Sequence, residues 1–151
     1  MTTVIIDYES GNLHSAEKAF QRMAAETGAG AVVVTSDPET VARAERVVLP
    51  GDGAFPACRR ALFERSGLFA AIEEAAISRG RPFLGICIGM QMMATRGMEY
   101  EETAGFGWIG GTVERIAPSD PALKVPHMGW NDLAIDRAHP LLGGIKTGDH
   151  A

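Results

Sequence analysis

The sequence contains no long apolar run and no excess of basic charge. No stretch of its 151 residues approaches the roughly 20 apolar residues that a membrane-spanning helix needs. The N-terminal residues MTTVIIDY also lack the basic region and the cleavage site of a secretory signal. With 14 Lys and Arg against 19 Asp and Glu, the net charge is -5, which argues against binding to a nucleic-acid backbone. These absences predict a cytoplasmic protein that binds neither membranes nor nucleic acids.

Cysteines and metal-ligand clusters are also scarce. The two cysteines, Cys58 and Cys87, are expected to be free thiols in a reducing compartment. We find no metal-ligand cluster in the sequence and expect neither a metal nor another cofactor. The length, with 46% hydrophobic and 22% charged residues, predicts one globular domain over residues 1–151.

The most informative stretch is residues 81–93, which read RPFLGICIGMQMM. Residues 82–86 are typical of a fully buried strand at the centre of a parallel sheet, and the residues after Cys87 are good helix formers. A strand that turns at once into a helix must bend sharply, and Gly85 and Gly89 remove the Cβ atoms that would clash there. This pattern predicts a nucleophile elbow.

Cys87 stands at the apex of the predicted turn. The positive end of a helix dipole lowers the pKa of a thiol and favours the nucleophilic thiolate. Cys87 is therefore the candidate for covalent attack on a carbonyl carbon. The alternative interpretation is a buried structural cysteine followed by a loose, glycine-flanked turn. The predicted strand before Cys87 and the predicted helix after it favour the catalytic interpretation.

Strands and helices alternate along the chain. Apolar, β-branched runs indicate strands, and apolar residues at helical spacing indicate helices; Asp37 followed by Pro38 has the pattern of a helix N-cap. The alternation predicts an α/β fold with a doubly wound, mostly parallel sheet and functional loops at the carboxyl ends of its strands. We expect strands at residues 3–7, 31–35, 47–49, 82–86 and 108–116, a hairpin partner at 131–135, and helices at 13–28, 37–44 and 67–78.

Residues 50–53, with the sequence Pro-Gly-Asp-Gly, follow one of these buried strands. Gly51 and Gly53 allow the backbone to adopt positive φ and to approach a ligand closely. Alone, this pattern would indicate an ordinary strand-to-helix turn. Together with the elbow it predicts an oxyanion hole made by the N–H groups of Gly53 and Ile88.

Two further motifs accompany the elbow and the Pro-Gly-Asp-Gly loop: residues 7–13, and the segment Val-Pro-His-Met-Gly-Trp-Asn at 125–131. The four motifs together are more specific than any one of them. In them the sequence resembles the glutamine amidotransferase subunits of imidazole glycerol phosphate synthases, a class I (triad) family of histidine biosynthesis. The likeness runs from Val4 to Ala151. It implies a flavodoxin-like class I amidotransferase fold that is incomplete at the C-terminus.

The resemblance also implies an activity. L-Glutamine would bind near Gly51 and Gln91, and Cys87 would attack its amide to form a glutamyl thioester. The ammonia released would pass to a cyclase subunit with a (β/α)8 barrel, the partner in a heterodimer, which makes imidazole glycerol phosphate. Residues expected to face this partner are Asn12, His127, Met128, Gly129, Trp130 and Asn131. A tryptophan such as Trp130 suits an interface anchor, although it is as often part of a core.

The sequence departs from the family pattern in three places. Glu9 stands where the resemblance leads us to expect glycine, and Asp52 where it leads us to expect valine. An acid at 52 would oppose the developing negative charge or point to solvent. The third departure is that the His-Pro-Glu motif, which supplies the family's base and its orienting acid, does not occur in these 151 residues.

The four histidines do not replace that motif. His139-Pro140 is followed by a leucine in place of the acid, and we expect each histidine (His14, His127, His139 and His150) to be structural or exposed. The simplest expectation is a truncated chain that hydrolyses glutamine poorly by itself. Two alternatives remain: a non-catalytic module that docks on the cyclase, or another cysteine hydrolase on a similar sheet.

Overall fold

The structure is a computed structural model that describes residues 1–150 of the chain. It divides into two compact units, Met1–Arg115 and Ile116–Ala151. The larger first unit contains all of the strands.

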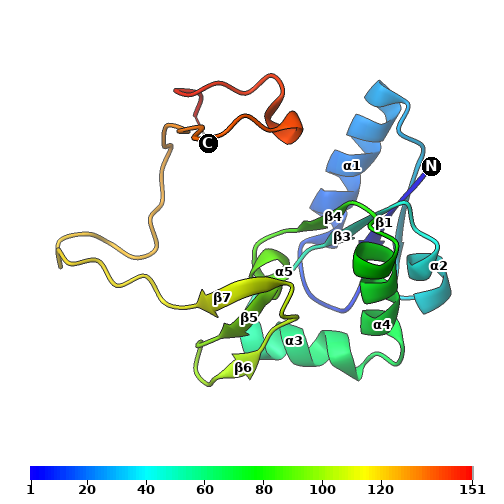
Figure 1. The fold of residues 1–151 in the computed structure, drawn as a ribbon, viewed down its shortest axis with the longest axis horizontal. Helices are drawn as coiled ribbons and strands as arrows, with labels where there is room; N and C mark the ends of the chain where they lie inside the picture. The colour runs from blue at the N-terminus through cyan, green and yellow to red at the C-terminus, as the bar shows by residue number, and fades with distance from the viewer. Residues whose placement is uncertain (151) are drawn as a thin grey trace. The chain divides into compact units, whose positions relative to one another are not determined.

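The first unit is built on a four-stranded parallel sheet (Figure 1). Its strands are β1 (Thr2–Ile6), β2 (Ala31–Thr35), β3 (Arg46–Leu49) and β4 (Phe83–Gly85), in the spatial order β2-β1-β3-β4. Every pair in this sheet is parallel. The predicted α/β fold with a mostly parallel sheet is therefore confirmed.

The first two helices begin and end at signals that the sequence carries. α1 (Leu13–Thr27) follows the N-cap Asn12 and ends at Gly28, which adopts the left-handed conformation that favours glycine. α2 (Pro38–Ala42) follows the predicted N-cap Asp37. Right-handed connections from β1 to β2 and back from β2 to β3 place these helices on opposite faces of the sheet, as Figure 1 shows.

Three further helices pack around the sheet. α3 (Phe55–Glu64) was not predicted, while α4 (Leu68–Glu73) and the π-helical turn that continues it (Glu74–Ser78) occupy the predicted helix at 67–78. α5 (Ile88–Gln91) is a single turn after Cys87. None of the helices within residues 1–150 is both long and apolar enough to cross a membrane.

The hydrophobic core lies on the sheet face covered by α2, α3 and α4. Alternate residues of β1 and β3 point into it, as the two-residue period of a strand requires, and the helices contribute fully buried aliphatic side chains. Members of this core include Val4, Ile6, Val47, Leu49, Val41, Leu62, Leu68 and Ile72.

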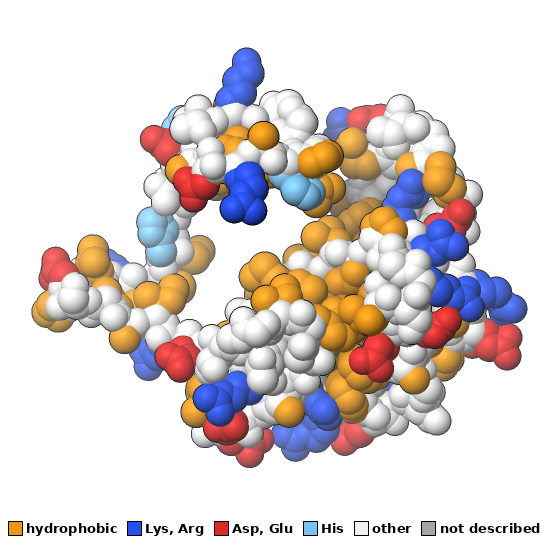
Figure 2. All heavy atoms as spheres, viewed as in Figure 1, with side chains coloured by type: hydrophobic (Ala, Val, Ile, Leu, Met, Phe, Trp, Pro, Cys, Tyr) orange, Lys and Arg blue, Asp and Glu red, His pale blue; other side chains and the backbone are white. Residues whose placement is uncertain are grey.

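The position of β4 differs from the prediction. We expected residues 82–86 at the centre of the sheet, but β4 is an edge strand that pairs only with β3 in the described part of the chain. Leu84 is 49% exposed and Ile86 is 37% exposed. Figure 2 shows hydrophobic side chains gathered in this region of the first unit. An apolar run indicates that a strand favours burial, but it does not indicate whether a neighbouring strand covers it.

A second, smaller sheet completes the first unit. Its strands are β5 (Ala94–Gly97), β6 (Thr103–Ala104) and β7 (Ile109–Val113), in the order β6-β5-β7. β7 lies within the strand predicted at 108–116, whereas β5 and β6 were not predicted. Beside this sheet, aromatic rings from α3, α4 and β4 pack with two rings from the segment between β6 and β7. The centroids of neighbouring rings are 4.2 to 6.5 Å apart, and the residues are Phe63, Phe69, Phe83, Phe106 and Trp108.

The second unit has little regular structure over residues 116–150. It contains one 3-10 turn, Pro140–Leu142, and an isolated antiparallel bridge between Asp132 and His150. The predicted hairpin between residues 108–116 and 131–135 is wrong, because β7 pairs in parallel with β5 and no strand forms at 131–135.

Candidate active site

Cys87 occupies the sharp turn between β4 and α5. Its backbone has φ 54° and ψ -117°, a positive-φ conformation that is rare for residues other than glycine. Its side chain is exposed. Strained backbone of this kind persists where the surrounding structure enforces it, and it concentrates at functional sites. The predicted nucleophile elbow is thus present as a geometry, with its sulfur outside the packed interior.

Two glycines make this turn possible. A Cβ on Gly85 would lie 2.6 Å from the carbonyl oxygen of Gly89 and from the backbone nitrogen of Met90. A Cβ on Gly89 would overlap the carbonyl oxygen of Leu49, at the end of β3. Both positions therefore exclude any side chain. Gly85 avoids the clash that we expected within the bend, whereas Gly89 avoids a clash with the neighbouring strand β3.

The glycine loop at residues 50–53 lies against the elbow. A Cβ on Gly51 would stand 2.9 Å from the backbone nitrogen of Gly89 and 3.1 Å from the Cβ of Ile88. β3 and β4 are neighbours in the sheet, so their carboxyl ends bring the two loops together. The structure thus unites two motifs that are separated by more than thirty positions in the sequence.

The two predicted oxyanion donors have backbone N–H groups without an acceptor among residues 1–150. Gly53 is exposed and has φ +91°, and Ile88 is the first residue of α5, where a helix leaves its N–H groups unpaired. Free N–H groups beside a nucleophile are what an oxyanion hole requires. α5 is only four residues long, so its dipole is smaller than that of the longer helix we expected.

A buried tyrosine holds the base of the glycine loop. The hydroxyl of Tyr8 donates a hydrogen bond of 2.7 Å to the carbonyl oxygen of Pro50, and the side chain is 0% exposed. Burial, partly offset by a hydrogen bond with Ser10, raises the pKa of Tyr8 far above its usual value. The phenol therefore stays protonated and serves as a donor that fixes Pro50.

The two residues that depart from the family pattern both make specific contacts. Glu9 has φ 65°, a conformation that glycine adopts without strain, and its carboxylate lies 2.9 Å from the guanidinium of Arg65. Asp52 neither points freely to solvent nor remains unpaired: its Oδ1 accepts a hydrogen bond of 2.8 Å from the N–H of Gly11. We expected this acid either to oppose the developing negative charge or to point to solvent. The observed contact with Gly11 is a third role.

The other predicted residues lie at the surface or beside the elbow. Gln91 is half-buried at the end of α5. Asn12 is exposed, and its side chain accepts a hydrogen bond of 3.1 Å from the N–H of Ser15 as the N-cap of α1. In the second unit all of residues 127–131 are exposed, including Met128 at 85% and Trp130 at 82%. Trp130 is therefore not a core residue of that unit.

All four histidines are exposed, as expected. In the second unit, Nδ1 of His139 accepts a hydrogen bond from the N–H of Leu141, and Nε2 of His150 lies 3.1 Å from Asp132. Within the first unit, no side chain forms a hydrogen bond with the sulfur of Cys87. The elbow thus offers an exposed thiol and unpaired N–H groups, but no base in contact with the thiol within the first unit.

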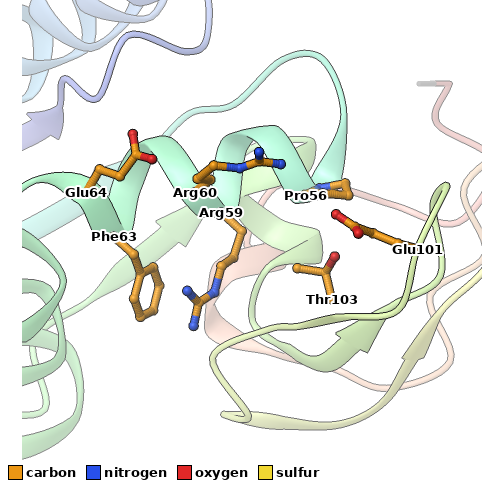
Figure 3. Close-up of a pocket in the computed structure, with 7 residues that line it drawn as sticks. All are labelled: Pro56, Arg59, Arg60, Phe63, Glu64, Glu101 and Thr103. Carbon is orange, nitrogen blue, oxygen red and sulfur yellow. The ribbon is translucent and has the colours of Figure 1, made fainter.

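Figure 3 shows a separate, open pocket of about 460 Å³ on α3. The guanidinium of Arg59 lies 3.3 Å from the centroid of the Phe63 ring, and its Nε donates to the carbonyl oxygen of Ala104. Burial lowers the pKa of Arg59. None of the predicted site residues lines this pocket, whose walls are Pro56, Arg59, Arg60, Phe63, Glu64, Glu101 and Thr103.

Comparison with known proteins gives a family and a set of relatives. The sequence profile of the family described as glutamine amidotransferase class-I matches residues 4–147. The imidazole glycerol phosphate synthase subunit HisH of Cereibacter sphaeroides is 76% identical over 151 residues, which cover 100% of this chain and 71% of the relative. The subunit of the same name from Ruegeria pomeroyi is 69% identical over 150 residues, covering 99% and 71%. That from Rhizobium meliloti is 53% identical over 151 residues, covering 99% and 70%.

Proposed function

The chain belongs to the class-I glutamine amidotransferase family, and we propose that Cys87 is the nucleophile with which it hydrolyses glutamine for an imidazole glycerol phosphate synthase. The observation that carries this proposal is the exposed Cys87 at positive φ, on a turn that lies against the glycine loop. The family match includes residues of both compact units, so we treat residues 1–151 as parts of one amidotransferase domain.

The chemistry follows from the groups at the elbow. The thiolate of Cys87 adds to the side-chain amide carbon of glutamine, and the electrons of the C=O bond move to the oxygen. The N–H groups of Gly53 and Ile88 hold this oxyanion. The intermediate collapses, the C–N bond breaks, and the nitrogen leaves as ammonia after gaining a proton. Water then hydrolyses the thioester to glutamate and restores the thiol. We propose that Gly51 and Gln91 bind the substrate beside the turn.

Proton transfer requires a general acid and base. No base contacts Cys87 in the first unit, and the family's His-Pro-Glu motif is not among the 151 residues. We therefore expect the isolated chain to hydrolyse glutamine poorly.

Ammonia made at this site would serve a partner. Free ammonia in neutral water is largely protonated and is then no longer a nucleophile, so direct delivery to a cyclase subunit is favoured. We propose a heterodimer with a cyclase built as a (β/α)8 barrel, with Asn12 and residues 127–131 facing it. The exposed Trp130 and Met128 support this surface. The two free thiols suit a cytoplasmic location.

Labelling with a chloroketone analogue of glutamine tests the nucleophile. Peptide mapping should place the label on Cys87 and leave Cys58, which is 3% exposed, unmodified. Excess glutamine should slow the labelling, and Cys87→Ser should abolish it. Labelling that is indifferent to glutamine, or that persists in Cys87→Ser, would contradict the proposed site.

A second candidate function is a docking module without catalysis, which the exposed Trp130 and the lack of a base beside Cys87 within the first unit favour. This function predicts that the chain binds the cyclase but is not labelled by the glutamine analogue. Glutamine-protected labelling of Cys87 would instead favour the glutaminase.

A further inference from the structure

The open pocket on α3 is lined by charged side chains of both signs that do not pair with one another. The pocket has a volume of about 460 Å³ and is shown in Figure 3. Its charged residues are Arg59, Arg60, Glu64 and Glu101, and none of the four forms a salt bridge among residues 1–150. Arg60 and Glu64 are four positions apart on α3, a spacing at which opposite charges commonly pair, yet they too remain apart. The pocket therefore presents two cations and two anions to a ligand.

Arg59 is held in one orientation within this pocket. Its guanidinium carbon lies 3.3 Å from the centroid of the Phe63 ring, and that ring stacks on Phe69 with centroids 4.2 Å apart. Its Nε donates a hydrogen bond of 3.2 Å to the carbonyl oxygen of Ala104 in β6. These two contacts fix the plane of the guanidinium, and they leave both Nη groups without an acceptor among residues 1–150. A fixed guanidinium with two free Nη groups is a planar fork that binds a carboxylate through two parallel hydrogen bonds.

The charges around Arg59 decide which carboxylate ligand fits. Burial lowers the pKa of Arg59, and no anion among residues 1–150 offsets its loss of hydration. A ligand carboxylate would offset that loss. In Figure 3 the carboxylate of Glu101 lies on the opposite side of Thr103 from the Arg59 guanidinium. Two glutamates disfavour a ligand whose only charge is negative, such as phosphate, whereas they attract an ammonium group. Both charged groups of an amino acid therefore find a complement in this pocket.

We propose that this pocket binds a free α-amino acid with an apolar side chain. The carboxylate of the ligand accepts hydrogen bonds from the Nη groups of Arg59, and its ammonium group donates to the carboxylate of Glu101. The hydroxyl of Thr103 is a further donor for the ligand carboxylate. Pro56 and the edge of the Phe63 ring supply an apolar wall for the ligand side chain. The binding is non-covalent, and it is independent of the proposed glutaminase activity.

Three related molecules separate the two charged contacts. L-Leucine carries both charged groups, 4-methylpentanoate is leucine without its amino group, and L-leucinamide has a neutral amide in place of the carboxylate. Each is titrated into the isotopically labelled chain, and the shifts of backbone amide NMR signals measure its Kd. Leucine should bind with a Kd of about 1 mM or lower, modest because the pocket is open, and the signals of Thr103 and Ala104 should shift. The other two molecules should bind at least about tenfold more weakly, because each leaves a charged group without its partner.

Two variants test the contacts one at a time. Arg59→Lys keeps the charge but loses the planar fork, and it should weaken leucine binding at least about fivefold. Glu101→Gln should weaken leucine binding about tenfold, but it should not weaken the binding of 4-methylpentanoate, which has no ammonium group. Arg22→Lys and Glu26→Gln, at exposed positions on α1, are the matched controls and should bind leucine as the wild type does.

Several outcomes would overturn the inference. The absence of a saturable shift up to about 10 mM leucine would show that the pocket binds no amino acid of this kind. Equal affinities for leucine and 4-methylpentanoate would show a site for simple anions. Leucine that slows the labelling of Cys87 by the glutamine analogue would place the amino acid at the elbow and not on α3. If Arg59→Lys lowers the unfolding temperature of the chain, Glu101→Gln decides alone, and unchanged leucine binding in that variant would overturn the proposal.

Discussion

The α-carbon of Gly89 lies directly against the backbone carbonyl of Leu49, so that a methyl group at position 89 would overlap the carbonyl oxygen. Leu49 ends β3, and Gly89 is in the first turn after Cys87. This contact is between backbone groups on both sides, and a side-chain rotation cannot relieve it. The approach of the elbow to the glycine loop therefore depends on a glycine at 89.

Gly89→Ala should displace the elbow from the glycine loop. We expect glutamine-protected labelling of Cys87 to fall at least about tenfold, because a displacement of about 1 Å in a reacting group can cost a hundredfold in rate. Gly110→Ala is the matched control, since a Cβ at 110 would meet no atom within 4 Å. Equal labelling rates in the two variants would contradict a steric requirement at 89.

Tyr8→Phe should destabilise the first unit through the glycine loop. The buried carbonyl of Pro50 loses its only side-chain donor among residues 1–150, which costs about 1 to 3 kcal/mol. The free energy of unfolding in urea at neutral pH measures this loss. Tyr100→Phe, at a side chain that is 90% exposed, should change it by less than about 0.5 kcal/mol.

The same residue predicts how stability depends on alkaline pH. Burial raises the pKa of Tyr8 in the folded chain, whereas an unfolded tyrosine titrates near about pH 10. Above that pH the unfolded state binds fewer protons, so this contribution to stability is complete below about pH 10 and is lost as the pH rises further. Urea unfolding of the wild type should show this decline, and Tyr8→Phe should lack it. An identical decline in Tyr8→Phe would assign it to other groups.

Leu62→Ala should leave a cavity between α3 and the sheet. Leu62 is 0% exposed and belongs to the main hydrophobic core, and truncations of this kind cost about 2 to 5 kcal/mol. Leu141→Ala, at a side chain that is 84% exposed, is the matched control and should cost less than about 0.5 kcal/mol. Chemical denaturation monitored by circular dichroism compares the two, and similar losses would contradict the observed packing.

Trp130→Ala should weaken binding to the cyclase subunit without reducing stability. The side chain is 82% exposed, and an aromatic anchor at an interface is worth about 2 kcal/mol or more, which is roughly thirtyfold in Kd. Titration calorimetry measures this affinity, with Leu141→Ala as an exposed control in the same unit. Unchanged affinity in Trp130→Ala would remove this residue from the interface.

Patterns confined to one element predicted that element well. The apolar residues of α1 recur at helical spacing, and Gly28 and Asp37 stand where a helix end and a helix start require them. The strand at 31–35 coincides with β2. Such signals are local, because the backbone hydrogen bonds and caps that they describe join residues a few positions apart.

Signals that depend on a neighbour were missed. β5, with the sequence Ala-Thr-Arg-Gly, has no apolar alternation and is a strand because β6 and β7 pair with it. Leu84 lies in an apolar run whether or not a further strand covers it, so its exposure could not be read from the sequence. α3 lacks a side-chain cap and begins at Phe55-Pro56, directly after the glycine loop, and we assigned no element there.

The sequence by itself determined the local chemistry of this protein: a cysteine between two glycines, after an apolar strand and before a helical turn, with a glycine-rich loop elsewhere in the chain. Only the tertiary structure decided which groups meet. Ser10 and Asp52 are 42 positions apart and bond because β1 and β3 are neighbours in the sheet. Strand order depends on how the helices and strands pack together in three dimensions. The residue pattern of a single loop does not indicate which other loop lies beside it.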